Sequence, residues 1–307
     1  MCGMKRVSVV IVNYNTRDLL EHCLHRLLDS RLDRPMSVFV VDNGSRDGSA
    51  DLIRDHFPSV ELIASSRNLG YAAANNLALE RIHQRWLEDG KPADNCALLL
   101  NTDCFVEPDS LQVTASFLDA NPDAGIVGPK LVLRDGSLDL ACRRSFPRPV
   151  NALWKLTGLS LLFPDSPRFA SYNLTYLDPD KTAEVDSVVG AFMMVRLDAI
   201  DGAGLMDDSF FMYGEDLDWA YRIKQLGWQT FYYPATTVLH YKGATSSRQS
   251  TRLIIEFYRA MYLFHRKHYA QDLPDVVNAL ITAGIIGRGM FALVRNLFRP
   301  ASARKVG

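Results

Sequence analysis

The sequence predicts an α/β fold in which a mostly parallel, Rossmann-like sheet is flanked by helices. Apolar, β-branched runs alternate with segments of helical periodicity through the first hundred residues. Such a β-α-β-α-β-α-β order implies parallel strands joined by right-handed crossovers. Polar clusters follow three of the apolar runs, where parallel strands of this kind carry their ligand sites.

Four strands and three helices account for this first part of the chain. The run at 7–12 is apolar throughout, as expected of a strand buried on both faces. Further strands are expected at 37–41, 60–64 and 96–100. Helices are expected at 17–30, 45–56 and 71–86, where apolar residues recur at helical spacing.

The second half of the chain is less regular. We expect helices at 109–120, 215–226 and 251–269, and strands at 185–195 and 228–233. Residues 143–180 mix prolines, aromatic residues and arginines without periodicity. This segment is predicted to be a long loop or lid.

The C-terminal segment has a composition of its own. Residues 276–287 carry no charge but are too few to span a bilayer, which takes about 20 residues. Arg288, Arg295 and Arg299 then fall on one face of a helix, opposite apolar residues. We expect a main domain at 1–270 and an amphipathic helical segment at 271–307. This segment would contact a membrane surface or, alternatively, pack on the protein's own core or on a second subunit.

The composition excludes several classes of protein. The chain has 307 residues, 48% of them hydrophobic, and a formal net charge of -1, so no basic field exists to attract nucleic acid. Its five cysteines form no C-x-x-C pair, which argues against a disulfide framework or a structural zinc site and favours a reducing cytoplasm. The apolar run at 7–12 is too short for the core of a signal peptide.

Three polar groups are candidates for ligand binding. Asp42, in the sequence Asp-Asn-Gly-Ser, follows a predicted strand and could accept hydrogen bonds from a base or a ribose. Asp103, in Asn-Thr-Asp, could bind a divalent cation, with His240 as its partner. A turn or a helix cap would explain the first two groups equally well, and a structural role would explain His240.

A run of acids supplies the candidate catalytic group. Glu215, Asp216 and Asp218 open a predicted helix, where acids are also favourable for purely electrostatic reasons. Neighbouring carboxylates repel, which raises a pKa toward the range of a general base. Asp218 and Arg222 are four residues apart and are expected to pair, leaving Glu215 and Asp216 free to face a cleft.

Taken in order, these motifs resemble family 2 glycosyltransferases, which have the GT-A fold. The resemblance covers about residues 7–268 and is greatest to the bacterial rhamnosyltransferase-like members. It is carried by Val-Ile-Val-Asn-Tyr-Asn, Val-Asp-Asn-Gly-Ser-x-Asp-Gly-Ser, Asn-x-Gly-x-x-x-x-x-Asn, Leu-Leu-Asn-x-Asp, Gly-Ala-Phe-Met-Met-Val, Glu-Asp-x-Asp-x-x-x-Arg and His-x-x-Gly-x-Thr.

The resemblance implies a role for each motif. Tyr14 and Asp42 would hold a pyrimidine base, while Asn68 and Gly70 would shape the donor pocket. The donor-side motif Asn101-Thr102-Asp103 matches D-x-D, with Asn101 in place of its first acid. Asp103 and His240 would hold Mg²⁺ or Mn²⁺. Asp216 would be the catalytic base, with Glu215 beside it contacting the acceptor.

The implied activity is inverting transfer of one sugar in the synthesis of cell-envelope polysaccharide. The first choice of donor is dTDP-rhamnose, and the alternative is a UDP-hexose. The acceptor would be a hydroxyl of a glycan or of a lipid-linked glycan. The enzyme would work on the inner face of the plasma membrane, as a monomer or a homodimer. The alternative is a non-catalytic module that binds nucleotide sugars. A nucleotidyltransferase, a P-loop enzyme and a processive synthase are disfavoured because their motifs are absent from the sequence.

Overall fold

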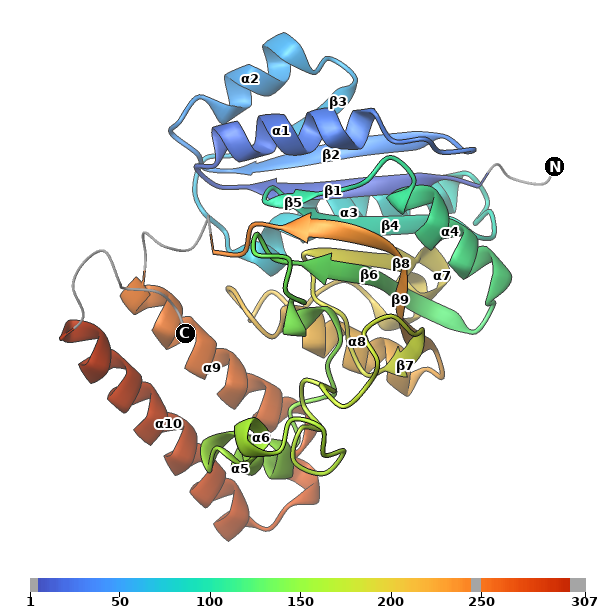
Figure 1. The fold of residues 1–307 in the computed structure, drawn as a ribbon. Coiled ribbons are helices and arrows are strands. Elements are labelled where there is room, and N and C mark those ends of the chain that lie inside the picture. The colour runs from blue at the N-terminus through green and yellow to red at the C-terminus, as the bar shows by residue number, and fades with distance from the viewer. Residues whose placement is uncertain (1–4, 244–249, 299–307) are drawn as a thin grey trace.

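A nine-stranded sheet lies at the centre of the structure, a computed structural model in which residues 5–243 and 250–298 are described (Figure 1). The strand order is β3-β2-β1-β4-β8-β6-β9-β5, with β7 pairing on β9 beside this path. Arg299, and Thr245 of the motif His-x-x-Gly-x-Thr, lie outside the described residues.

The first part of the sheet is parallel, as expected, and the second part is mixed. β1 pairs with β2 and β4, and β2 with β3, all in parallel. β8 then runs antiparallel to both β4 and β6, and β6 pairs with β9 in parallel. The strands are β1 (Val7–Asn13), β2 (Met36–Asn43), β3 (Val60–Ser65), β4 (Cys96–Asn101), β5 (Cys104–Phe105), β6 (Ala124–Val132), β7 (Ala183–Val185), β8 (Phe192–Arg196) and β9 (Gln229–His240).

Helices cover the sheet and extend beyond it. Those of the main body are α1 (Arg17–Leu28), α2 (Ser49–His56), α3 (Tyr71–Glu88), α4 (Ser110–Ala120), α7 (Leu197–Ala203) and α8 (Glu215–Gln225). Four helices of the second half extend beyond the sheet: α5 (Pro149–Leu156), α6 (Leu159–Leu162), α9 (Ser250–His268) and α10 (Asp275–Leu297). Short 3-10 turns occur at Leu140–Cys142 and Ala270–Asp272.

Two expectations for the second half were wrong, and one strand was not expected. Residues 143–180 contain α5 and α6 and are not a continuous loop. The strand expected at 185–195 is two strands, β7 and β8, separated by a segment that includes Gly190. β6 escaped prediction because Gly125, Gly128 and Pro129 lower its strand propensity. The pairing of β6 with β9 accommodates the proline by a register shift after Pro129.

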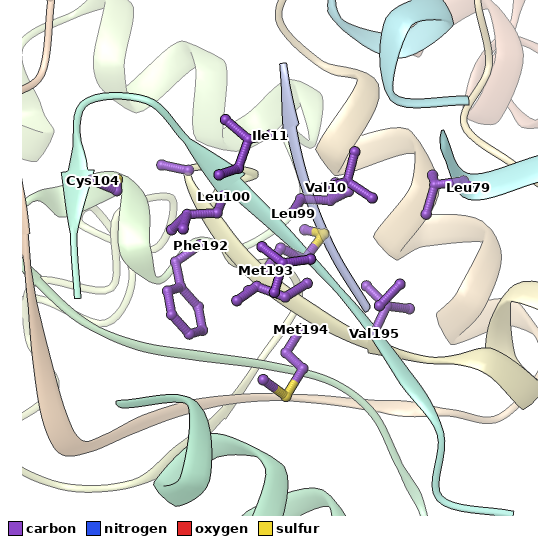
Figure 2. Packing of buried hydrophobic residues seen from close by; sticks show 14 of the residues in the cluster. Val10, Ile11, Leu79, Leu99, Leu100, Cys104, Phe192, Met193, Met194 and Val195 are labelled. Atoms are coloured by element: carbon purple, nitrogen blue, oxygen red, sulfur yellow. The ribbon is translucent and has the colours of Figure 1, made fainter. Parts of the chain in front are cut away.

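The core lies along the middle strands of the sheet. Val10 of β1, Leu99 of β4 and Met193 of β8 are each 0% exposed. Figure 2 shows these side chains gathered where β4 is flanked by β1 and β8. The continuous apolar sequence of these strands is explained by this burial, since both faces of the sheet are covered.

The C-terminal segment is one continuous helix. α10 has 23 residues and is long and apolar enough to cross a membrane by length and composition. At 1.5 Å per residue it is about 35 Å long. The uncharged run at 276–287, which alone is too short to span, is thus part of a longer helix that continues through Arg288 and Arg295. α10 packs along α9 and is otherwise largely exposed (Figure 1).

The burial of β4 makes its leucines a test of the fold. We expect Leu99→Ala to lower the free energy of unfolding by about 3 kcal/mol, because it leaves a cavity in a closed core. Leu87→Ala, at an α3 position that is 41% exposed, is expected to change it by less than about 0.5 kcal/mol. Urea unfolding followed by circular dichroism measures both values, and equal losses would contradict this core.

Candidate active site

Polar residues from three strands meet at one edge of the parallel half of the sheet. The register aligns Asn13 of β1 with Asp42 of β2, and Val12 of β1 with Asn101 of β4. These are the carboxyl ends of neighbouring parallel strands, where α/β sheets bind ligands. Tyr14 follows β1 directly and is half-buried at this same edge.

A buried chain of hydrogen bonds fixes this edge. The Thr16 hydroxyl donates to Asn13 Oδ1 over 2.7 Å and receives the Thr102 hydroxyl over 3.1 Å. Asn13 Nδ2 in turn donates to Asp42 Oδ1 over 3.1 Å. The Ser45 backbone N–H donates to the other oxygen of Asp42 over 3.2 Å. Each Asp42 oxygen thus keeps a lone pair for a further donor, as base or ribose binding would require.

The loop before α3 is held against the same edge. The amide of Asn43 donates to Asn68 Oδ1 and to the carbonyl of Gly70, each over 3.1 Å. Gly70 has a φ of +90°, and a Cβ there would lie 2.5 Å from the carbonyl oxygen of Phe211. Only glycine fits, because both the backbone conformation and the space exclude a side chain. Asn68 and Gly70 are therefore held against Asn43, the residue that follows Asp42 in β2.

Asp103 and His240 come together although they are far apart in sequence. The antiparallel pairing of β5 with β9 sets Cys104 opposite His240. His240 Nε2 lies 3.5 Å from Asp103 Oδ1, and both side chains are buried. With the Cys104 sulfur, they form a group whose ligand atoms all lie within 4.8 Å of one another. Mg²⁺ and Mn²⁺ prefer oxygen over sulfur, and imidazole is a ligand of transition metals, so Asp103 is the fitting donor for either ion and His240 for Mn²⁺.

Asp139 orients the histidine. His240 Nδ1 lies 2.8 Å from Asp139 Oδ2, and Lys242 donates to Asp139 Oδ1 over 2.7 Å. Burial alone would lower the pKa of His240, but its hydrogen bonds to Asp103 and Asp139 outweigh burial and raise it to about 9. At neutral pH this imidazole carries a proton on each ring nitrogen, so a cation would have to displace the proton on Nε2. Because Nδ1 faces a carboxylate, Nε2 is the nitrogen that a cation would meet, as is usual at metal sites.

The acids that open α8 differ in their partners. Asp218 is 0% exposed and pairs with Arg222 over 2.9 Å, as expected, and also with Lys267 and His268. We had expected the Asp216 carboxylate to be free of partners, but it is not. Its Oδ2 accepts from Arg144 Nη2 over 2.7 Å and from the backbone N–H of Gly190 over 3.0 Å. Its Oδ1 accepts from the backbone N–H of Leu217 over 2.8 Å.

Tyr71 connects Asp216 to the donor-side motif. Its hydroxyl lies 2.8 Å from the carbonyl of Gly190 and 3.1 Å from Asn101 Oδ1. Gly190 therefore contacts Tyr71 through its carbonyl and Asp216 through its N–H. A Cβ at Gly190 would lie 3.3 Å from the Tyr71 hydroxyl, so a larger residue would crowd this contact.

Glu215 is buried beside this network. Burial, and then the negative charge of Asp216, raise the pKa of Glu215 to about 8. Among the described residues, none lies within hydrogen-bonding distance of Glu215 Oε2. Glu215 is thus an uncharged acid at neutral pH, next to an Asp216 that Arg144 holds.

Four residues of the site escaped the sequence analysis. Asp139 and Tyr71 stand in no motif that marks them. Arg144 lies in the segment taken for a loop, where Arg143-Arg144 was the only signal of a buried cation. Gly190 begins Gly-Ala-Phe-Met-Met-Val and was noted only as part of that motif.

Solved structures share this fold. A structure of residues 1–349 of Staphylococcus aureus TarS in complex with UDP matches with a TM-score of 0.53, over 96% of this chain and 75% of that one, at 16% identity. GalNAc-T7 with UDP, GalNAc and Mn²⁺ matches with a TM-score of 0.55, over 96% of this chain and 57% of that one, at 14% identity. The fold is that of GT-A glycosyltransferases.

Sequence comparison gives the family. The family model "Glycosyl transferase family 2" matches residues 8–177, more than half of the chain, and the protein belongs to this family. An N-acetylglucosaminyl-diphospho-decaprenol L-rhamnosyltransferase of Mycobacterium tuberculosis is 29% identical over 84% of this chain and 83% of its own length. Rhamnosyltransferase WbbL of Escherichia coli is 25% identical over 76% of this chain and 83% of its own length.

The raised pKa of Glu215 has a consequence for stability. Between pH of about 4.5 and 8 the folded state binds a proton that the unfolded state has lost, so stability falls as pH rises through this window. We expect Glu215→Gln to remove a slope of up to about 1.4 kcal/mol per pH unit.

The measurement is urea unfolding at several values from pH 5 to 8, compared with the unmodified protein. Glu80→Gln, on the exposed side of α3, is the matched control and should leave the slope unchanged. An unchanged slope in Glu215→Gln would contradict a buried, protonated Glu215.

Proposed function

We propose that this glycosyltransferase is an inverting enzyme that moves one sugar from a nucleoside diphosphate to an acceptor hydroxyl. The observation that carries the proposal is the hydrogen-bonded path from Asn101 through Tyr71 and Gly190 to Asp216. This path holds a candidate base at a fixed place relative to the donor-side motif, and pure binding of a nucleotide sugar would require no base.

The proposed donor is dTDP-rhamnose, with a UDP-hexose as the alternative. The names of the Mycobacterium tuberculosis and Escherichia coli relatives support rhamnose. The UDP in the TarS and GalNAc-T7 structures supports a pyrimidine nucleotide. Tyr14, Asp42, Asn68 and Gly70 would surround the nucleoside, and the donor-side motif 101–103 would face its diphosphate.

Asp103 and His240 are the proposed ligands of a divalent cation. The carboxylate oxygen suits Mg²⁺ or Mn²⁺, and the imidazole, a ligand of transition metals, favours Mn²⁺ of the two. A cation bound there would neutralise charge on the departing diphosphate. Asp139 keeps Nε2 of His240 directed toward Asp103 through its own contact with Nδ1.

Asp216 is the proposed general base. Three hydrogen bonds use three of the about four lone-pair positions of its carboxylate, which leaves one for the acceptor hydroxyl. As the hydroxyl proton passes to Asp216, the oxygen bonds to the anomeric carbon and the bond to the diphosphate breaks on the opposite face. The anomeric configuration inverts. Glu215, uncharged beside Asp216, would contact the acceptor as a hydrogen-bond donor.

The proposed setting is the cytoplasmic face of a membrane, with a lipid-linked glycan as acceptor. The apolar, largely exposed α10 supports this setting. In this proposal residues 1–270 are the catalytic domain and residues 271–307 lie against the lipid. A homodimer that covers α10 is the alternative arrangement.

Nucleotide binding is the first test of the proposal. Ligand binding to the folded state stabilises it, by about 2.7 kcal/mol at a hundredfold excess over Kd. We therefore expect UDP or dTDP to raise the melting temperature, and to raise it more with Mn²⁺ because the cation would strengthen diphosphate binding. Asp103→Ala should remove the effect of the metal, whereas Asp109→Ala, an exposed acid nearby in sequence, should not. If neither nucleotide shifts the melting temperature under any metal, the chain is no donor-dependent transferase.

Replacement of the base is the second test. Asp216→Asn should lower kcat by about 10²–10⁴-fold, the usual range for a general base, with the nucleotide-induced melting shift preserved. Asp198→Asn, at an acid in the first turn of α7, is the matched control and should keep full activity. Product formation from radiolabelled donor measures both variants. Near-normal turnover of Asp216→Asn would exclude Asp216 as the base.

A further inference from the structure

A cavity lies apart from the candidate active site. It has a volume of about 500 Å³ and is lined by α5, α6, the segment after α6, α9 and α10. It therefore involves the part of the chain taken for a loop together with the C-terminal helix pair. None of the residues predicted to bind the donor or the metal lines it.

Positive charge gathers in this cavity without compensation. Lys155 of α5 and Arg288 and Arg295 of α10 line it, and no aspartate or glutamate does. Across residues 5–243 and 250–298, no carboxylate forms an ion pair with any of these three cations. The surrounding protein, and then the charges of Arg288, Lys242 and Arg144, lower the pKa of Lys155. Cations that repel one another in this way favour an anionic ligand.

The walls of the cavity are amphipathic. Its three cations are exposed, whereas Asn151, Ala170 and Ile254 are buried. Leu161, Phe169 and Phe257 add apolar wall, so cations and apolar side chains line the same cavity. A ligand that fits must carry an anionic group beside a hydrocarbon chain.

The cavity is connected to the candidate base. Tyr172 lines the cavity and interacts with Arg144, which pairs with Asp216 over 2.7 Å. Lys155 Nζ lies 5.3 Å from the centre of the Tyr172 ring. Lys155, Tyr172 and Arg144 thus form a series of contacts that leads from the cavity to Asp216.

The surface around the cavity is apolar. Leu161 and Leu162 of α6 are 84% and 71% exposed, and Phe291 and Leu297 of α10 are both 68% exposed. Exposed side chains of this size on neighbouring elements mark a surface that contacts lipid or another protein. The unpaired cations beside these side chains favour a lipid that carries phosphate over a neutral lipid or an apolar protein surface.

We propose that this cavity binds the acceptor as a phosphate-bearing lipid, with its phosphate oxygens at Lys155, Arg288 and Arg295 and its hydrocarbon chain against the apolar wall. The inference rests on the proposed function, because the sugar carried by that phosphate supplies the hydroxyl that Asp216 deprotonates. It assigns the second substrate to residues that the donor and the metal do not use.

Farnesyl diphosphate, an amphiphile with both chemical features, is the probe. Its binding to the full chain would be measured by calorimetry in EDTA, so that a metal-dependent donor site stays silent. We expect Arg288→Gln/Arg295→Gln to weaken binding by roughly tenfold or more per arginine, since each loses a charge-assisted hydrogen bond. Arg288→Lys/Arg295→Lys should restore part of it. Arg266→Gln, an exposed cation of α9 outside the cavity, should bind normally.

Controls identify which part of the ligand is recognised. Farnesol and inorganic pyrophosphate should each bind far more weakly than farnesyl diphosphate. Equal loss in Arg266→Gln, or binding of pyrophosphate alone at full strength, would overturn the proposal. So would binding only to phosphatidylglycerol vesicles, which would assign the cations to a bulk anionic surface. A dimer in light scattering that fails to bind farnesyl diphosphate would assign the apolar surface to a second copy.

The result is independent of the donor experiment. Asp103→Ala should still bind farnesyl diphosphate in EDTA while it loses the metal-dependent nucleotide shift. If the unmodified chain binds farnesyl diphosphate but no nucleotide, the proposed transferase activity fails and the lipid cavity stands. If it binds nucleotide but no farnesyl diphosphate, the cavity proposal fails and the transferase stands.

Discussion

The buried ion pair between Arg144 and Asp216 holds the two sides of the site together. Arg144 comes from the irregular segment before α5 and Asp216 from the start of α8, so the pair joins segments 72 residues apart. Replacing one partner of such a buried pair lowers the stability of the fold by about 3–5 kcal/mol, because the remaining charge is left buried without a partner or water. The orientation of the candidate base therefore depends on a residue outside every motif that identifies the family.

The parallel half of the fold could be predicted because its signals are local. β1 and β4 are short apolar runs followed at once by the polar residues of the site, and the helices between them keep helical spacing. β6 and α5 have no comparable signal. β6 contains Gly128 and Pro129 and owes its strand conformation to β8 and β9 on either side, which no local pattern reveals.

The candidate site was predictable to the same extent. The position of Asp42 and Asn101 in the site could be predicted, because ligands bind at the carboxyl ends of parallel strands. The approach of His240 to Asp103 depends on the pairing of β5 with β9 across more than 130 residues. The residue types alone made His240 a candidate partner, and the resemblance to a family favoured it. Tyr71 reaches Gly190 across 119 residues and Asp139 reaches His240 across 101, so both roles arise from tertiary contacts alone.

The partners of the three acids at α8 also determine the electric field that an arriving substrate meets. The charge of Asp218 is balanced by Arg222 and Lys267, that of Asp216 by Arg144, and Glu215 keeps its proton at neutral pH. These three acids, which the sequence alone would count as three negative charges, therefore exert little repulsion on a nucleoside diphosphate, which is strongly anionic. An acidic sequence motif and an electrostatically open entrance are compatible here because every carboxylate is either paired or protonated.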